Sequence, residues 1–208
     1  MSPRCFTVAI DGPAATGKGT ISRAIAQEFG FAHLDTGLLY RAVGALALDG
    51  ADPIAAAQSL EPRALEDARL RTSEVAQAAS RVAVIPEVRA ALLAFQRSFA
   101  RRPGGAVLDG RDICTVIYPD AEAQLFVTAS PEVRAERRWK ELGAKGDTRS
   151  LVEVLEDVKA RDERDSTRAE APMKPSHGAL VLDTTDMSIA DAVAAAIAHV
   201  RDRLGEAG

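Results

Sequence analysis

Short apolar runs alternate along this chain with longer segments in which apolar residues recur at helical spacing. The short runs predict buried strands at residues 6–10, 31–35, 106–108, 124–128 and 180–182. Strands that alternate with helices favour a parallel sheet with helices on both faces. The expected fold class is therefore α/β, built on about five parallel strands.

The predicted helices begin and end at residues that typically cap helices. Gly30 follows a helical run that starts after the glycine-rich turn of residues 11–19, and the next helix is predicted over residues 38–48. Ser130 precedes a helix that runs to about residue 142, and Ser150 opens a capping-box pattern before a helix to about residue 168. Ser188 is expected to cap the last helix, and Ile189, Val193, Ile197 and Val200 lie on one face of it.

Residues 49–103 differ from the rest of the chain, because they are rich in alanine, helical in pattern and without a convincing strand. Residues 143–148 (GAKGDT) form a glycine-containing turn between two highly charged helices, which is typical of a mobile lid. We therefore expect a core domain of residues 1–38 and 105–208, a helical insert of residues 39–104 and a lid of residues 140–152.

Composition fits one globular domain with such an insert. The 208 residues are 47% hydrophobic and 27% charged, with a formal net charge of −4. Cys5 and Cys114 are too few for a disulfide framework and lack metal-binding spacing, so we expect a reducing, cytoplasmic environment. The sequence predicts neither a signal peptide nor a membrane span. The negative charge and 4% aromatic content argue against nucleic-acid binding, and without coiled-coil heptads a monomer is the default.

A glycine-rich loop with the sequence GPAATGKGT lies between the first predicted strand and its helix, which is the context of a phosphate-binding P-loop. Backbone amides of such a loop point at phosphate oxygens. Lys18 is expected to bridge the terminal phosphates of a nucleoside triphosphate, and Thr20 to bring its hydroxyl to a magnesium ion. A tight glycine turn without function is the alternative. The residues predicted to bind the triphosphate are Gly12, Pro13, Ala14, Ala15, Thr16, Gly17, Lys18, Gly19 and Thr20.

The glycine between Lys18 and Thr20 favours a small nucleoside-monophosphate kinase over a GTPase or a large ATPase, which place Ser or Thr directly after the lysine. The chain also lacks an NKxD motif for reading a guanine base and an LSGGQ-like transporter signature.

Charged residues also follow the second and third predicted strands, where ligands bind in such sheets. Asp35 ends the second strand, and Tyr40 and Arg41 come from the first turns of the next helix, where an arginine can hold an acceptor phosphate. After the third strand, Asp109 can hold magnesium through water and Arg111 can clamp a phosphate. The alternatives are that Tyr40 packs in the core, that Arg41 lies on a solvated helix face, and that residues 109–112 form a polar turn.

Two arginine-rich helices complete the candidate chemistry. One face of a predicted helix carries Arg161, Arg164 or Asp165, and Arg168. The preceding helix carries a stripe of Arg134, Arg137 and Arg138, and Arg149 lies beside the predicted lid. A salt-bridged surface helix gives the same pattern. Two such helices joined by a glycine turn nevertheless suit a flap over polyphosphate. His33, His177 and His199 belong to no catalytic constellation, so we expect them to be structural or surface residues.

Five motifs in order along the chain resemble those of bacterial cytidylate kinases: IDGPAATGKGT, LDTGLLYR, ASRVAVIPEVR, LDGRDICTVIYPDA and RDERDSTRAEAP. The set is specific, whereas the P-loop alone is not. The resemblance implies a P-loop kinase fold with a core, an insert that binds the nucleoside monophosphate and a lid. It also implies transfer of the γ-phosphoryl group of ATP to CMP or dCMP, with magnesium.

The resemblance assigns roles residue by residue. It implies that Arg41, Arg111 and Arg168 bind the CMP phosphate and, with Lys18 and Asp109, form the catalytic set. Ser80, Arg89 and Asp112 match residues that read the hydrogen-bonding edge of cytosine, and Arg161 and Asp165 match those that contact the sugar. Asp35, Thr36 and Tyr40 match the same substrate pocket, and Arg137 and Arg138 are similar to lid-side arginines near ATP.

One departure from the family pattern concerns the insert. Many members carry a small β-sheet before the segment that matches LRTSEVAQAAS, but only about residues 64–69 stand in its place here. The preference between CMP and dCMP is therefore open. Two alternative functions also remain. One is a shikimate, adenylate or thymidylate kinase of the same fold, but the RDERD sequence of residues 161–165 and the Ser80/Arg89 pair argue against it. The other is a regulatory protein that binds ATP with little turnover.

Overall fold

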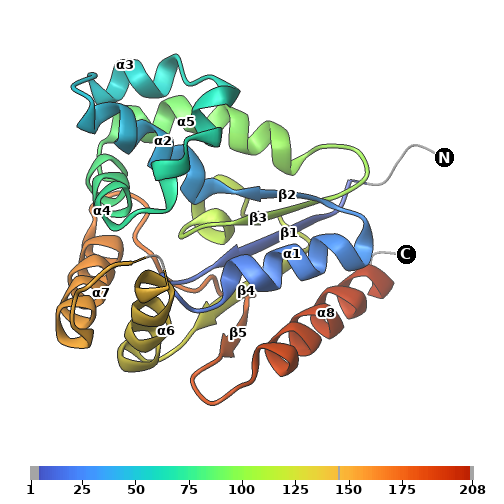
Figure 1. Ribbon diagram of the computed structural model, residues 1–208. Coiled ribbons are helices and arrows are strands. Elements are labelled where there is room, and N and C mark those ends of the chain that lie inside the picture. The colour runs from blue at the N-terminus through green and yellow to red at the C-terminus, as the bar shows by residue number, and fades with distance from the viewer. Residues whose placement is uncertain (1–4, 145, 207–208) are drawn as a thin grey trace.

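The structure is a computed structural model that describes residues 5–144 and 146–206, and it contains the five-stranded parallel sheet that the sequence predicts (Figure 1). The strands are β1 (Thr7–Asp11), β2 (Ala32–Asp35), β3 (Ala106–Asp109), β4 (Ala123–Thr128) and β5 (Leu180–Asp183). Their order is β2-β3-β1-β4-β5, so the chain fills one side of β1 before it crosses to the other. Such a reversal leaves a ligand crevice at the carboxyl end of the central strand.

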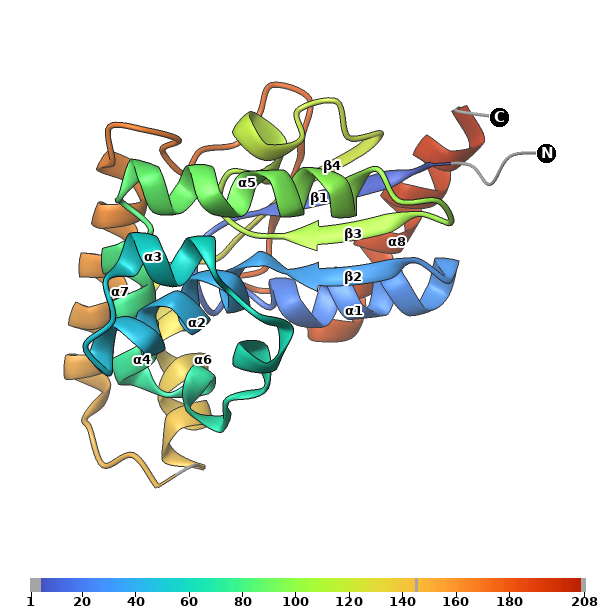
Figure 2. The same cartoon turned by 90° about the horizontal axis from the view of Figure 1, so that it is seen from above.

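Helices cover both faces of the sheet, as Figure 2 shows. One face packs against α1 (Lys18–Phe29) and α8 (Ile189–Glu206), and the other against α5 (Pro86–Ala100) and the short π-helix η3 (Ile113–Ile117). Val8 and Ile10 of β1 face the first pair, whereas Ala9 faces the second, as alternation along a strand requires. The central strand is buried along its whole length, which fixes the loop that follows it.

Residues 39–104 contain helices and no strand, as the sequence predicts. They comprise most of α2 (Thr36–Leu48), then α3 (Pro53–Gln58), η1 (Pro62–Glu66), η2 (Ala68–Arg71), α4 (Ser73–Val82) and α5. Helices α2 and α4 pack closely at Gly44, where a Cβ would lie 2.7 Å from the Ala79 backbone nitrogen. Helix α5 joins this layer to the sheet, because Val88 and Leu92 pack in the helical layer and Ala100 packs on β-strand residues.

Helices α6 (Pro131–Gly143) and α7 (Leu151–Thr167) lie side by side near the carboxyl ends of the strands (Figure 1). The Ser130 hydroxyl caps α6 by accepting from the Val133 amide, and Ser150 and Glu153 form the predicted capping box of α7. Arg134, one of the three arginines of the predicted stripe, is buried and bonds Asp162 of α7 at 2.5 Å. It thereby joins the two helices.

Two helices differ in detail from their predicted form. On α8, Val193, Ile197 and Val200 pack in or against the core together with Ala192 and Ala196, whereas Ile189 is 53% exposed. Helix α2 begins at Thr36, two residues before its predicted start. No turn separates it from β2, because Asp35 is both the last residue of the strand and the N-cap of the helix. Among the described residues, no helix combines the length and the apolar character needed to cross a bilayer.

Candidate active site

The P-loop fills the crevice at the carboxyl end of β1. Gly12 has a φ of 136°, and a Cβ at this position would lie 2.0 Å from the Val127 carbonyl oxygen, so only glycine allows the chain to leave β1 beside β4. Gly17, with a φ of 93°, precedes α1, and no side chain of the described residues caps this helix. The uncapped amino end of α1 therefore offers partial positive charge to an anion in the loop.

Lys18 is buried at the start of α1, and its Nζ donates to the Gly12 and Pro13 carbonyls at 2.7 and 2.6 Å. Burial, with a further contribution from the Arg111 charge, lowers the pKa of Lys18 to about 7. The side chain is thus held against its own loop at the edge of a basic cavity. A bound polyphosphate would favour the charged form and raise this pKa.

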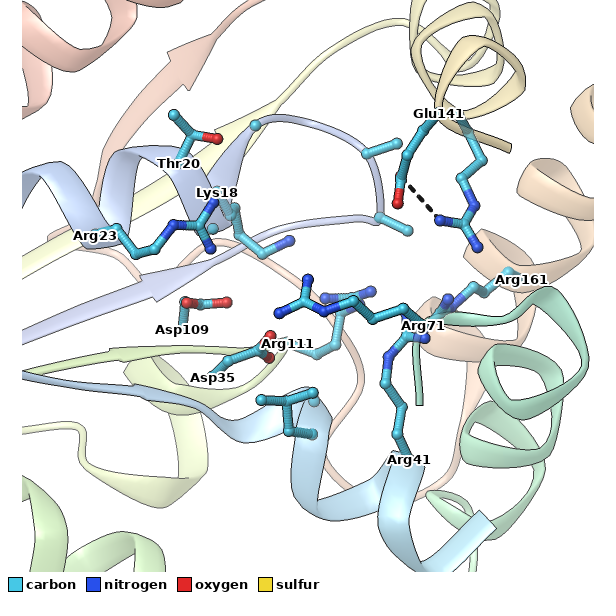
Figure 3. A pocket seen from close by; sticks show the side chains of 17 residues that line it. Lys18, Thr20, Arg23, Asp35, Arg41, Arg71, Asp109, Arg111, Glu141 and Arg161 are labelled. Atoms are coloured by element: carbon cyan, nitrogen blue, oxygen red, sulfur yellow. Dashed lines mark hydrogen bonds and ion pairs between the residues drawn. The ribbon is translucent and has the colours of Figure 1, made fainter. Parts of the chain in front are cut away.

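A cavity of about 390 Å³ lies between the P-loop, β2, β3 and the helices α6 and α7 (Figure 3). We call it the central cavity. Its basic lining residues are Lys18, Arg23, Arg41, Arg71, Arg111, Arg138 and Arg161, and its acidic ones are Asp35, Asp109 and Glu141. Basic side chains therefore outnumber acidic ones in a strongly polar space, which is the electrostatic character of a site for polyanions. Predicted residues Ala14, Ala15, Gly17, Gly19 and Thr20 also line it.

Asp35 and Asp109 are cross-strand partners at the carboxyl ends of β2 and β3. Burial and the neighbouring Asp109 charge raise the pKa of Asp35. Two like charges held together in this way favour a nearby cation. In residues 5–144 and 146–206 no three His, Cys, Asp or Glu side chains form a metal cluster. The donor set fits a magnesium ion that keeps phosphate and water ligands and takes few from protein, with Thr20 and Asp109 at hand.

A narrow cavity adjoins the central one and collects the residues predicted to bind the acceptor. It is lined by Thr36, Tyr40, Ser80, Arg89, Arg111, Asp112, Arg161, Asp165 and Arg168. Arg111 and Arg161 line both cavities, whereas Asp35 and Arg41 line the central cavity alone. The narrow cavity measures about 50 Å³, well below the roughly 300 Å³ of common ligand pockets, because its polar side chains are bonded to one another.

Asp112 is enclosed by two guanidinium groups in this narrow cavity. Arg89 donates from Nη2 to Oδ2, and Arg168 donates from Nη2 to Oδ1 at 3.1 Å. The Ser80 hydroxyl accepts from Arg164 Nε at 3.2 Å, which connects α4 to α7. Burial raises the pKa of the Tyr40 hydroxyl in the same wall. With Asp165, the lining of the narrow cavity thus presents guanidinium donors, hydroxyl groups and two carboxylates.

Asp165 lines the narrow cavity and contacts Arg111 and Arg161, the two arginines that line both cavities. It accepts from Arg111 Nε at 2.9 Å and lies 3.9 Å from Arg161 Nε. Burial opposes the charge of Arg111, but the carboxylates of Asp165, Asp109 and Asp35 together outweigh burial and raise the Arg111 pKa. Arg161 is the opposite case, since burial and the Arg111 charge lower its pKa to about 9. Its Nε is buried and has no hydrogen-bond partner among the described residues, so this donor is available to a ligand in the adjoining cavities.

A third cavity of about 340 Å³ lies beside the P-loop next to α8, lined by Thr16, Gly17, Arg137, Thr184, Met187, Ser188, Ile189 and Ala192. Arg137 is fixed there by Thr184, to whose hydroxyl and carbonyl it donates at 3.0 and 2.7 Å. The two lid-side arginines therefore separate, because Arg138 lines the central cavity. Gly12 and Pro13 line none of these three cavities and contribute the carbonyls that hold Lys18.

Comparison with known proteins decides the family. The family model for cytidylate kinase matches residues 8–202. The chain belongs to the cytidylate kinase family. A cytidylate kinase from Cereibacter sphaeroides strain KD131 is 65% identical, over 95% of this chain and 96% of its own. One from Xanthobacter autotrophicus is 55% identical, over 95% and 98%. A gluconokinase structure from Sinorhizobium meliloti shares the fold, with a TM-score of 0.51 at 16% identity over 95% and 93% of the two chains.

Several residues at this cytidylate kinase site escaped the sequence analysis. His33 Nε2 lies 2.7 Å from Asp109 Oδ2, although we expected the histidine to be a structural or surface residue. Arg71 and Glu141 line the central cavity, and Gln77 accepts from Arg164 at 2.6 Å. Strand pairing could have indicated His33, since residue 33 lies two positions before the Asp35 that pairs with Asp109. Arg71 lies in the family-matching segment LRTSEVAQAAS, but the sequence analysis assigned it no role.

Proposed function

We propose that this member of the cytidylate kinase family transfers the γ-phosphoryl group of ATP directly to CMP or dCMP, giving ADP and CDP or dCDP. The observation that carries the proposal is that Arg111 and Arg161 line both the basic central cavity and the narrow cavity. A phosphate at this boundary would join a nucleoside in the narrow cavity to the polyphosphate on the P-loop. In-line transfer between two phosphates needs positioning and charge stabilisation rather than a covalent enzyme intermediate.

The donor half of the proposal uses the P-loop and the two cavities beside it. Residues 14–20 would hold the ATP phosphates, and Gly12 and Pro13 would act by positioning Lys18. The third cavity has room for the base of ATP beside Arg137, while Arg138 would face the phosphates. Lys18 would leave the loop carbonyls and bind the terminal phosphates, which offsets the charge that develops during transfer.

The acceptor half follows the chemistry of the narrow cavity. The Watson–Crick edge of cytosine has an amino donor beside two acceptors, and Asp112, Arg89 and Ser80 offer the matching carboxylate, guanidinium and hydroxyl. Arg161 and Asp165 would contact the sugar, with Thr36 and Tyr40 in the same wall. The CMP phosphate would meet Arg41, Arg111 and Arg168, with Asp35 nearby in the central cavity.

Magnesium belongs to the proposal as a counter-ion of the ATP phosphates, with Asp109 binding it through water and Thr20 through its hydroxyl. When bound, the ion would neutralise part of the phosphate charge. His33 holds one Asp109 oxygen, which orients the carboxylate and leaves the other oxygen for this task. A cytoplasmic location and a monomeric state are also part of the proposal, and light scattering of the purified protein tests the second.

The test is ADP release with ATP and magnesium and one acceptor at a time: CMP, dCMP, UMP, AMP, shikimate or none. Rapid turnover with CMP or dCMP and slow turnover with the others is expected. Preference for AMP or shikimate would mean that the narrow cavity is misassigned. ADP release that does not depend on an acceptor, or ATP binding without turnover, would overturn the proposed transfer and favour a regulatory ATP-binding protein.

A further inference from the structure

Arg71 lies in the central cavity and is the second residue of the family-matching segment LRTSEVAQAAS, but no role has been assigned to it above. It ends η2, directly after residues 64–69, which stand in place of the β-sheet of other family members, and its side chain is exposed and extends into the cavity (Figure 3). Arg41, Arg111 and Arg138 of this cavity are bonded to Leu70, Asp165 and Glu141. By contrast, no described residue forms a hydrogen bond or ion pair with the Arg71 guanidinium.

The backbone that leads into Arg71 is held by the two residues before it. Arg69 donates to both oxygens of Asp49 at 2.9 and 2.8 Å and to Asp67 at 2.8 Å, which ties η2 to the end of α2. The Leu70 side chain is 2% exposed, and its carbonyl accepts from Arg41 Nη1 at 2.6 Å. A fixed backbone with an unbonded guanidinium is preorganised for a ligand, because little more than side-chain freedom is lost on binding.

The charges around Arg71 define the class of that ligand. Arg41, Arg111 and Arg161 line the same cavity, and the burial of Arg41 and its neighbouring Arg138 charge lower the Arg41 pKa to about 10. Another guanidinium in this surrounding is unfavourable unless an anion offsets it. Guanidinium groups match phosphate oxygens with two parallel hydrogen bonds, so the ligand is a phosphate.

We propose that Arg71 binds the phosphoryl group in transfer, between Lys18 on the donor side and Arg41 on the acceptor side. Figure 3 shows the Arg71 side chain reaching toward the part of the cavity that holds Lys18 and Asp35. This role rests on the proposed phosphoryl transfer and adds a residue to it. It also gives the shortened insert a function, because residues 64–69 lead directly into Arg71 and so set the position of this cation.

Arg71→Ala is the first variant, and its expected effect is a fall in kcat of about 10²-fold with a smaller change in the KM for CMP. Arg71→Lys keeps the positive charge but not the two-pronged guanidinium, and its kcat is expected to lie between those of the wild type and Arg71→Ala. Arg63→Ala is the matched control, since Arg63 lies on η1 with its side chain 84% exposed and bonded to Glu61. Guanidinium ion in the assay is expected to restore part of the Arg71→Ala turnover and to leave the control unchanged.

Arg69 is a positioning residue in this proposal, and a double-mutant cycle tests it. Arg69→Ala alone is expected to lower kcat less than Arg71→Ala does, and the double variant to match Arg71→Ala, because Arg69 acts only through Arg71. Thermal unfolding of all variants checks that the fold is kept. Additive effects of the two substitutions would overturn the positioning role of Arg69.

A kcat within twofold of wild type in Arg71→Ala, or no rescue by guanidinium, would overturn the role of Arg71. The acceptor panel on the wild type separates this from a failure of the proposed function. If another acceptor replaces CMP, the cytidylate assignment fails and the Arg71 variants are assayed with that acceptor. If no acceptor supports ADP release, both proposals fall.

Discussion

Arg168 Nη2 donates to Asp112 Oδ1 at 3.1 Å, and both side chains are only 5% exposed. This bond connects the residue that follows α7 to the turn that follows β3, two segments that the chain separates by 56 positions. Arg89 holds the other carboxylate oxygen from α5. A buried carboxylate shared by two cations is strongly destabilised when either partner is lost, so the three side chains must be treated as one unit.

Arg168→Ala is expected to reduce turnover with CMP by about 10²–10³-fold while ATP binding stays nearly unchanged. ATP binding is spared because Arg168 lines the narrow cavity and does not line the two cavities that adjoin the P-loop. Steady-state kinetics and calorimetric ATP titration measure the two effects. An Arg168→Ala protein with normal turnover would remove this residue from the site.

Asp112→Asn is expected to change base selectivity. The carboxylate can accept from the amino group of cytosine, whereas uracil has a carbonyl at that position. The asparagine amide can turn a donor toward that carbonyl, so the ratio of kcat/KM for CMP to that for UMP should fall by at least about tenfold. An unchanged ratio, with activity lost equally for both nucleotides, would show that Asp112 only supports Arg89 and Arg168.

The lowered pKa of Lys18 predicts that the protein takes up a proton when ATP binds. Its pKa is lowered to about 7 by burial and the Arg111 charge, so at pH 8 the side chain is largely neutral before binding. The triphosphate favours the charged form, so binding at pH 8 should take up close to one proton, and the uptake should vanish below about pH 6, where Lys18 is already protonated. Calorimetry in buffers of different ionisation enthalpy measures the proton number, and Lys18→Met should abolish the uptake.

Local signals in the sequence predict the elements of this fold well. The strands are short β-rich runs, and the Ser150/Glu153 capping box lies within four successive residues, so both depend on neighbours along the chain. The P-loop follows for the same reason, since its turn is built from consecutive residues with strict backbone demands at Gly12 and Gly17.

Contacts between distant segments decide what the sequence could not predict. Arg134 and Asp162 meet only because α6 and α7 pack together, and an arginine stripe on one helix does not reveal which of its members is buried. His33 and Asp109 meet through the pairing of β2 with β3. Arg71 reaches the site from the end of η2, a helix of four residues that is too short for helical periodicity to indicate a face.

Asp11 gives a prediction on stability. Its carboxylate is fully buried at the end of β1 and accepts from the Ile113 and Cys114 amides, both at 2.8 Å. Burial outweighs these two hydrogen bonds and raises the pKa of Asp11 to about 6. Because the folded-state pKa lies above the unfolded value of 3.8, the folded protein holds this proton more tightly than the unfolded chain between these two values.

The contribution of Asp11 to the free energy of unfolding should therefore be largest below about pH 4, decline as the pH rises to about 6 and stay constant above. Asp11→Asn removes the titration and loses one of the two acceptors, so the variant should be less stable at every pH. The difference in Tm between wild type and variant isolates the effect from every other titrating group. It should shrink from pH 4 to pH 6 and be flat from pH 6 to pH 8. A difference that grows over the first interval would mean that the two amide hydrogen bonds outweigh burial and hold the pKa below its ordinary value.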